Sequence, residues 1–336
     1  MEKTLECAME GKSRNLQMIK WIAACFVIVS HAFPITTGNT NTEPLLILTR
    51  GRVSFGGLAV GIFFFTAGLY IAQSMEKKKT AKAFFAARCK RIFPPLIFTV
   101  LLTIFMGMFL TTYSLMDYVT NPKTWMYLLN GILIPVHNLP GIFENQPYLP
   151  TVNGALWTLP VEFACYVVCF LLYKCKLLTG KGGIIPLIVI YGGVVIVLLF
   201  EDRLAGLSNI IRPCLLFGIG MMTWVYRGNL SLGGKKTWIV TILFFAGMLT
   251  PFANIAMYVF LPFMIVELSY LEMQVPEKLA KPGALSYGIY LCGFPIQQIL
   301  VHFFHQMTPL QNILIAIPLA LCGGAVIYFV TERKKK

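Results

Sequence analysis

Two ionisable residues lie inside otherwise apolar runs, and their side chains could exchange protons with a substrate. His31 lies late in the first such run, and Glu162 lies near the start of a later one. A neutral imidazole can take a proton from a hydroxyl at neutral pH, so His31 is a candidate general base. Glu162 is a candidate partner that orients it. The alternatives are a histidine that snorkels at a membrane boundary and a glutamate that makes a structural hydrogen bond to a neighbouring helix.

Arg88 and Arg91 lie three residues apart, directly before an apolar run that starts at Ile92. On a helix this spacing places both guanidinium groups on one face. Two such groups, with Lys90 between them, suit a ligand that carries phosphate, which arginine binds through paired hydrogen bonds. The alternative is that these residues only anchor the chain at the membrane surface.

Lys20 precedes His31 by eleven residues in the same apolar run. A helix rises 1.5 Å per residue, so about 16 Å separates the two positions. Lys20 is therefore expected near the opposite face of the membrane and not as a direct partner of His31. It either supports the site from a distance or anchors the helix on the inner side.

The elements that must position these residues are membrane-spanning helices. Of the 336 residues, 57% are hydrophobic and 12% are charged, against roughly 25% charged in a soluble domain. The mean hydropathy is +0.72. Because a spanning helix needs about 20 apolar residues, we predict an all-α, multi-pass integral membrane protein with one domain over residues 1–336. The predicted spans are about 18–35, 53–73, 92–112, 155–173, 184–200, 208–226, 237–250, 254–271, 284–304 and 309–330.

The distribution of positive charge predicts the orientation of these ten spans. With the N-terminus inside, 23 of the 28 Lys and Arg residues fall in segments that face the cytoplasm, where such residues concentrate in membrane proteins. We therefore expect both termini in the cytoplasm, with 1–17 as an N-terminal segment and 331–336 as a basic tail. The same distribution accounts for the net charge of +14 without a nucleic-acid partner.

The segment 113–154 does not fit a simple span. Its apolar stretch from Trp125 to Pro135 is too short to cross a bilayer. We expect either a helix that lies in the outer interface or a partly re-entrant element. Such an element could cover a site that opens outward, or it could be a surface helix without a role.

No metal centre and no disulfide framework are predicted. The nine cysteines lie in apolar runs or basic segments, and no two form a Cys-x-x-Cys pair. His302 and His305 would share a helix face in the ninth span. No carboxylate is obviously near them, so we expect interfacial residues and no metal ligands.

Taken together, these motifs resemble the membrane-bound acyltransferase 3 family. The patterns are Arg/Lys-x10-His, then Arg-x-x-Arg before the third span, then Leu-Trp-x-Leu-x-x-Glu-x-x-x-Tyr. Residues 63–68 and 286–296 resemble two further patterns of the family, and the likeness covers nearly the whole chain. In this sequence the three main motifs are Lys20 to His31, Arg88 to Arg91, and Leu156-Trp157-Thr158-Leu159-Pro160-Val161-Glu162 through Tyr166.

The resemblance implies an O-acyltransferase in the cell membrane that uses cytoplasmic acyl-CoA, with acetyl-CoA as the expected donor, and no bound cofactor. Arg88 and Arg91, with Lys90, would hold the phosphates of the donor. His31, aided by Glu162, would deprotonate a hydroxyl of a glycan or glycolipid at the outer face. An acyl-enzyme intermediate is the alternative to direct transfer. Lys20, Asn153, Trp157 and Tyr166 would support the site.

Three positions depart from the family's pattern. Gln17 stands where the family has an acidic residue, Gly293 where many members have histidine, and Lys334 where they have proline. The first two differences bear on the acceptor site.

Two other functions fit the span count. The main alternative is a transporter or flippase of a polar lipid or glycan precursor, although no inverted repeat or paired broken helices stand out. A glycan polymerase is the second alternative function.

Overall fold

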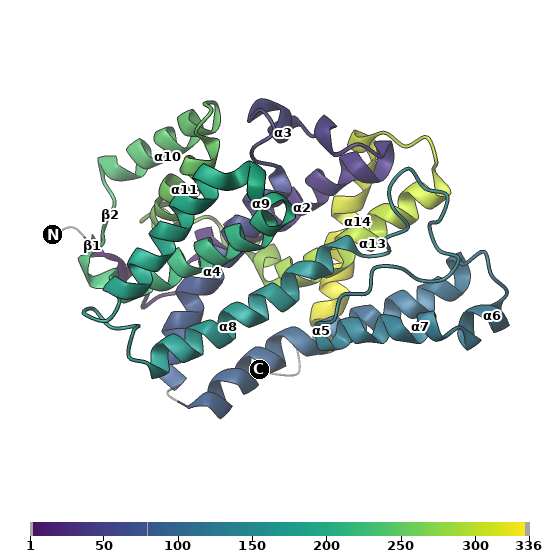
Figure 1. Cartoon of the computed structure of the whole chain (residues 1–336), viewed down its shortest axis with the longest axis horizontal. Helices are drawn as coiled ribbons and strands as arrows, with labels where there is room; N and C mark the ends of the chain where they lie inside the picture. Colours follow the sequence, from purple (N-terminus) through teal and green to yellow (C-terminus); the bar gives the residue numbers. More distant parts are fainter. Residues whose placement is uncertain (1–2, 79, 333–336) are drawn as a thin grey trace. The chain divides into compact units, whose positions relative to one another are not determined.

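The computed structural model describes residues 3–78 and 80–332, without the side chains of residues 3, 201, 202 and 205. It is 77% helical, and seven of the described helices are long and apolar enough to cross a membrane. Figure 1 shows that the described chain is predominantly helical, and the apolar helices make it a membrane protein. Residues 333–336 of the expected basic tail lie outside the described residues. The principal helices are α2 (Arg14–Thr37), α4 (Phe55–Lys78), α5 (Ala81–Leu110), α8 (Thr158–Lys174), α9 (Ile184–Val225), α10 (Lys235–Met248), α11 (Ala253–Ser269), α13 (Ser286–Phe303) and α14 (Pro309–Thr331).

These helices are distributed over two compact units, which we describe separately. The first unit comprises 1–23, 44–84 and 161–283, and the second comprises 24–43, 85–160 and 284–336. Helices α2, α5 and α8 each begin in one unit and end in the other. The single domain over residues 1–336 stays a prediction.

Each predicted span coincides with a helix or part of one, and the fifth and sixth share the 42-residue α9. In a straight helix Gly193 and Leu215 would lie about 33 Å apart. Instead, a Cβ built on Gly193 would lie 2.8 Å from Leu215, and one built on Gly218 would lie 2.8 Å from Ile190. Helix α9 therefore folds back on itself, and its two arms pack antiparallel.

Helix α4 packs against the second arm of α9 through glycine. An added Cβ at Gly68 would collide with the backbone carbonyl of Phe217, and one at Gly220 would collide with that of Phe65. Small residues let two helix backbones approach closely in membranes, where dispersion contacts drive packing. Gly68 therefore serves helix packing.

One end of the first unit gathers segments that are distant in sequence. Strand β1 (Lys3–Thr4) pairs antiparallel with β2 (Ser231–Leu232). Beside this pair, the Arg227 guanidinium lies 3.2 Å from the Glu6 carboxylate and 3.4 Å from that of Glu76. The N-terminal segment, the end of α4 and the turn after α9 thus meet at one end of this unit.

The segment 113–132 runs back along α5 in the second unit. It forms α6 (Leu115–Thr120), α7 (Pro122–Met126) and the short 3-10 helix η2 (Tyr127–Ile132). Near its start, the Tyr118 hydroxyl donates to the carbonyl of Ile104 over 3.1 Å. Near its end, a Cβ on Gly131 would lie 3.5 Å from Ile97. The contact point thus moves about 10 Å back along α5, so the segment packs against this helix, and the two alternatives of an interfacial helix and a partly re-entrant element both stay predictions.

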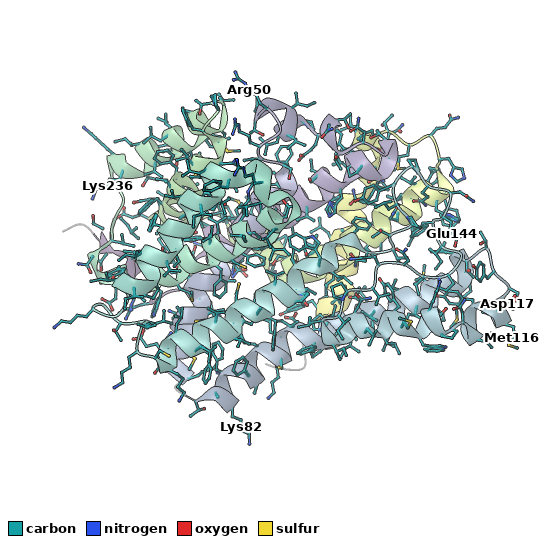
Figure 2. All side chains as sticks on the ribbon, viewed as in Figure 1. Arg50, Lys82, Met116, Asp117, Glu144 and Lys236 are labelled. Atoms are coloured by element: carbon teal, nitrogen blue, oxygen red, sulfur yellow. The ribbon has the colours of Figure 1, made fainter. Side chains whose placement is uncertain are left out.

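Asn130 satisfies the backbone where this segment turns. Its amide nitrogen donates to the carbonyls of Tyr127 (2.9 Å) and Val136 (2.8 Å), and its amide oxygen accepts from the nitrogen of Val136 (3.0 Å). Leu133 at the same turn has φ 67°. Non-helical backbone is tolerated at membrane depth only where its polar groups are paired within the protein. The chain then returns to the end of the unit marked by Met116, Asp117 and Glu144 in Figure 2.

Candidate active site

The segment of α2 that carries His31 is held by α13 within the second unit. A Cβ on Gly293 would lie 2.9 Å from the Ile28 side chain, so the two helices approach closely there. The Gln297 amide donates to the backbone carbonyl of Ile28 over 2.8 Å. Both contacts involve Ile28, one helical turn before His31, and therefore fix the position of that turn of α2 against α13.

The imidazole of His31 is oriented by an aromatic contact. It meets the ring of Phe294 edge to face, with the centroids 5.0 Å apart and the planes at 81°. The residue is partly exposed, and within the described parts of the chain neither ring nitrogen has a hydrogen-bond partner. Packing alone therefore orients the ring, and a ring nitrogen can engage a substrate hydroxyl without first breaking a protein hydrogen bond.

Gln297 links three helices, a role that its sequence position alone did not predict. Both Gln297 and Asn312 are fully buried. Besides its bond to Ile28, Gln297 donates to the Asn312 side chain over 2.8 Å, which joins α13 to α14. Loss of a buried partner costs about 1–3 kcal/mol. An amide pair at 297–298 inside an apolar run is the signal that could have identified it, because buried polar groups need partners.

The predicted supporting residue Asn153 connects a neighbouring loop to the same helix. Its side chain accepts from the nitrogen of Ala155 (3.1 Å), at the start of the 3-10 helix η3 (Gly154–Trp157), and donates to the carbonyl of Leu291 on α13 (2.9 Å). Because Asn153 is 1% exposed, it can support the site only by holding the loop against α13, and not by contacting a substrate. Trp157, also a predicted supporting residue, ends η3 and is partly exposed.

Thr158 and Tyr290 complete the attachment of η3 to α13. The Tyr290 hydroxyl donates to the carbonyl of Ala155 and is hydrogen-bonded to the Thr158 hydroxyl. An added Cβ on Gly154 would lie 2.9 Å from the ring of Phe294, the residue that contacts His31. Gly154 and the preceding Asn153 thus pack beside the contact between Phe294 and His31.

Glu162 has a hydrogen-bond partner on its own helix. The Tyr166 hydroxyl, one turn later on α8, donates to the Glu162 carboxylate. Tyr166 is 2% exposed and packs against the ring of Phe217 at 6.1 Å. Both residues belong to the first unit, whereas His31 belongs to the second. The pairing of Glu162 with His31 therefore stays a prediction.

Arg88, Lys90 and Arg91 lie in the first turns of α5, which confirms that the two arginines share a helix face. Helix α5 has 30 residues and is about 45 Å long. That exceeds the roughly 30 Å of the hydrocarbon layer, so its first turns can lie outside it.

Helix α13 contacts both the helical turn of α5 that carries the arginines, here called the arginine turn, and His31. The Tyr287 hydroxyl donates to the carbonyl of Ile92, the residue after Arg91, over 3.1 Å. Seven residues later on α13, Phe294 contacts His31. Seven residues rise about 10 Å, so the arginine turn and the imidazole stand at different levels of this one helix.

The family model described as an acyltransferase domain matches residues 14–329. The chain belongs to the acyltransferase 3 family. The resemblance seen in the motifs is thereby confirmed, and the protein is an acyltransferase. Among known proteins, it is similar to an O-acetyl transferase of Shigella phage Sf6, with 27% identity over 311 residues and 88% of each chain covered. It is also similar to nodulation protein 10 of Rhizobium leguminosarum bv. viciae, with 25% identity over 320 residues, covering 87% of this chain and 84% of the relative. No solved structure matches the chain.

The motif residues of this acyltransferase are divided between the two units. His31, Arg88, Lys90, Arg91, Asn153 and Trp157 belong to the second unit, whereas Lys20, Glu162 and Tyr166 belong to the first. Within the first unit, the Lys20 ammonium lies 5.1 Å from the centroid of the Tyr70 ring, a cation–π contact. The Tyr70 hydroxyl is hydrogen-bonded to that of Tyr270 over 2.7 Å. These contacts suit either predicted role of Lys20, as an inner anchor or as a distant support.

The predicted histidine pair near the end of α13 needs a correction. Helix α13 ends at Phe303, so His305 lies beyond the helix and does not share a face with His302. The His302 ring instead packs beside Phe143, with the centroids 5.8 Å apart. The capping box at Thr308 fixes the start of α14 at Pro309. Residues 304–308, which include His305, therefore form the connection between the two helices.

Proposed function

We propose that this acyltransferase moves an acyl group from cytoplasmic acyl-CoA, with acetyl-CoA as the expected donor, to a hydroxyl of a cell-surface or envelope glycan or its precursor. The observation that carries the proposal is the imidazole of His31, which packing orients and which is partly exposed. The O-acetyl transferase name of one relative supports transfer to oxygen. We place the protein in the cell membrane.

In the proposed reaction His31 takes the proton from the acceptor hydroxyl. The hydroxyl oxygen attacks the carbonyl carbon of the thioester, so a C–O bond forms while the C–S bond breaks. Coenzyme A leaves as the thiolate and takes up a proton, which His31 can return. In the alternative route the acyl group is carried first on His31 or another residue: a bond from that residue to the acyl carbon forms as the C–S bond breaks, and it breaks in turn as the acceptor oxygen forms the C–O bond.

The donor's charged end would bind at the first turns of α5. Arg88 and Arg91 would pair with its phosphates, and Lys90 would add a third positive charge. The rise of about 10 Å along α13 between the arginine turn and the imidazole leaves the nucleotide and the reacting carbonyl at separate levels. Lys20, Asn153, Trp157, Glu162 and Tyr166 would support the site.

We propose ten spans with both termini in the cytoplasm. The meeting of residues 3–6, Glu76 and 227–232 at one end of the first unit supports this, because all three segments are expected on the inner side. The fold-back of α9 supports two spans there.

For topology, we expect a cysteine placed at Asn145 to react with an impermeant maleimide from outside intact cells. A cysteine placed at Gly180 should react only after the membrane is opened, because the charge distribution places residues 174–181 inside. Protection of residue 145 and reactivity of residue 180 in intact cells would refute the proposed orientation.

The function is tested with purified protein in liposomes that contain a glycan acceptor and labelled acetyl-CoA. We expect label on the glycan only when donor and protein are both present. Movement of unmodified glycan across the bilayer without label would indicate a transporter, and lengthening of the glycan would indicate a polymerase. Either result without acyl transfer would overturn the proposal.

A further inference from the structure

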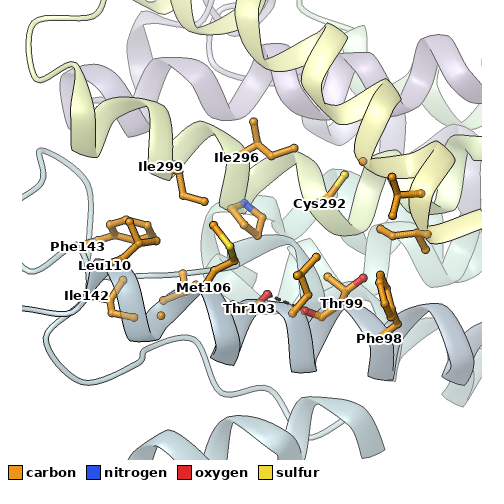
Figure 3. Close-up of a pocket in the computed structure, with 17 residues that line it drawn as sticks. Phe98, Thr99, Thr103, Met106, Leu110, Ile142, Phe143, Cys292, Ile296 and Ile299 are labelled. Atoms are coloured by element: carbon orange, nitrogen blue, oxygen red, sulfur yellow. Dashed lines mark hydrogen bonds between the residues drawn. The ribbon is translucent and has the colours of Figure 1, made fainter. Parts of the chain in front are cut away.

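A cavity of about 280 Å³ lies within the second unit, away from the residues assigned to catalysis. Its walls come from α5, α13, α14 and the loop that follows segment 113–132 (Figure 3). On α5 its lining extends from Phe98 to Leu110. Twelve residues of helix rise about 18 Å, more than half of the roughly 30 Å hydrocarbon layer. The cavity is therefore an elongated groove that follows the helix axis.

The groove has almost no capacity to hold water. Its hydroxyl groups already donate hydrogen bonds to backbone carbonyls of α5. Thr99 donates to Pro95 (2.9 Å), and Thr103 donates to Thr99 (2.8 Å). A buried water needs two to four polar partners, and an apolar cavity without them stays dry and accepts apolar ligands. Lysine, arginine, aspartate and glutamate are absent from the lining within the described residues. The chemistry of the groove thus selects an uncharged hydrocarbon.

One side of the groove opens toward the surface that lipid would cover. Leu102, Met106 and Val326 line it and are 42%, 37% and 53% exposed. Ile142 and Phe143, from the returning loop, are buried and close one end. A ligand can therefore enter sideways from a bilayer, while its length is limited by the loop.

The groove is distinct from the surroundings of His31. On α13 it uses Cys292, Ile296 and Ile299, which repeat at helical spacing on one face. Phe294 and Gln297, which contact the His31 segment, are absent from the lining. Helix α13 therefore presents one face to the candidate catalytic histidine and another to the groove.

We propose that this groove binds one hydrocarbon chain of a membrane lipid. The occupant is a flexible chain because the groove is long, apolar and open along its lipid side. A chain that fills it gains dispersion contacts with both walls, which an empty groove would forfeit. The occupant is an acyl chain of a phospholipid, because the loop that closes one end of the groove limits the occupant's length, and a polyprenyl chain is several times longer. The inference does not depend on the proposed acyl transfer.

The test uses the full-length protein in nanodiscs of phosphatidylcholine that contain increasing fractions of a phosphatidylglycerol with a diazirine at the chain end. After illumination, labelled peptides are identified by mass spectrometry. We expect labelling of peptides within 98–110 and 292–299 to saturate at a low mole fraction of the probe. In a second arm, unlabelled polyprenyl phosphate is added as competitor. We expect no displacement at equimolar competitor; displacement would assign the groove to a polyprenyl lipid and would overturn the proposal.

Filling the groove should remove the saturable labelling. Ile299→Trp adds volume inside the groove, and we expect labelling of these peptides to fall at least five-fold. The matched control is Leu314→Trp on α14, where the side chain is 63% exposed and lies outside the lining. If Ile299→Trp does not fold, Met106→Trp fills the groove from the opposite wall and should act alike. Labelling that rises in proportion to the probe fraction, or that persists in a folded filling variant, would overturn the proposal.

Discussion

Replacement of His31 by glutamine should reduce acyl transfer by roughly 10²- to 10⁴-fold, the usual contribution of a general base. Glutamine is polar and of similar size, so it can occupy the space beside Phe294, where the imidazole packs at 5.0 Å. It cannot accept the proton. Acyl-CoA affinity should remain nearly unchanged, because the arginine turn stands about 10 Å away along α13. The measurement is acyl transfer and acyl-CoA binding on the same purified protein.

His31→Ala and His305→Gln complete this experiment. The alanine variant should lose transfer to a similar extent while it still binds acyl-CoA. The control variant removes an exposed histidine beyond the end of α13 and should keep normal transfer. A purely structural His31 gives a different pattern, in which glutamine is tolerated or alanine lowers expression and binding together. Near-normal transfer by His31→Gln would exclude the general-base role and make Glu162 the next candidate.

Removal of either guanidinium at the start of α5 should weaken acyl-CoA binding by roughly 10- to 150-fold. A hydrogen bond to a charged group contributes about 1.5–3 kcal/mol, and 1.4 kcal/mol corresponds to a factor of ten. Arg88→Ala and Arg91→Ala should therefore each show a raised dissociation constant for acyl-CoA. Arg88→Lys should be intermediate, since lysine retains the charge but cannot form the paired bonds. Equilibrium binding to the purified variants measures the effect.

Lys82→Ala is the matched control for charge, because Lys82 is exposed on the first turn of the same helix. It removes one positive charge and should leave affinity within about two-fold, since a lone surface charge contributes little. All three alanine variants should keep the membrane orientation, because other basic residues remain in this segment. Affinity for acyl-CoA that is unchanged in Arg88→Ala and Arg91→Ala would assign the two arginines to membrane anchoring alone.

The helices were predictable because the bilayer imposes a local rule on the sequence. Backbone polar groups have no partners in lipid, so an apolar run of spanning length must pair them within its own helix. Each predicted span accordingly coincides with a helix or an arm of one. The spacing of Arg88 and Arg91 translated directly into a shared face for the same reason. The Glu162–Tyr166 hydrogen bond is also local, since residues four apart on a helix are neighbours.

The segment 113–154 could not be assigned from its own residues. Its short helices are too brief to span, and nothing in their sequence states which surface they contact. The Tyr118 bond to Ile104 and the turn closed by Asn130 show that the segment packs back along α5. Such a choice depends on a partner helix and therefore on the tertiary structure.

By itself the sequence determined the membrane class, the helices, the acyltransferase motifs and the candidate base. Only the tertiary structure showed that Phe294 orients His31, that Gln297 holds the turn before it, and that α13 bears a lipid-facing groove on another face. Periodicity specifies which residues share a face of one helix, but it carries no information about what that face meets. The partners of a face are set by packing between helices distant in sequence, where shape and buried hydrogen bonds decide the fit.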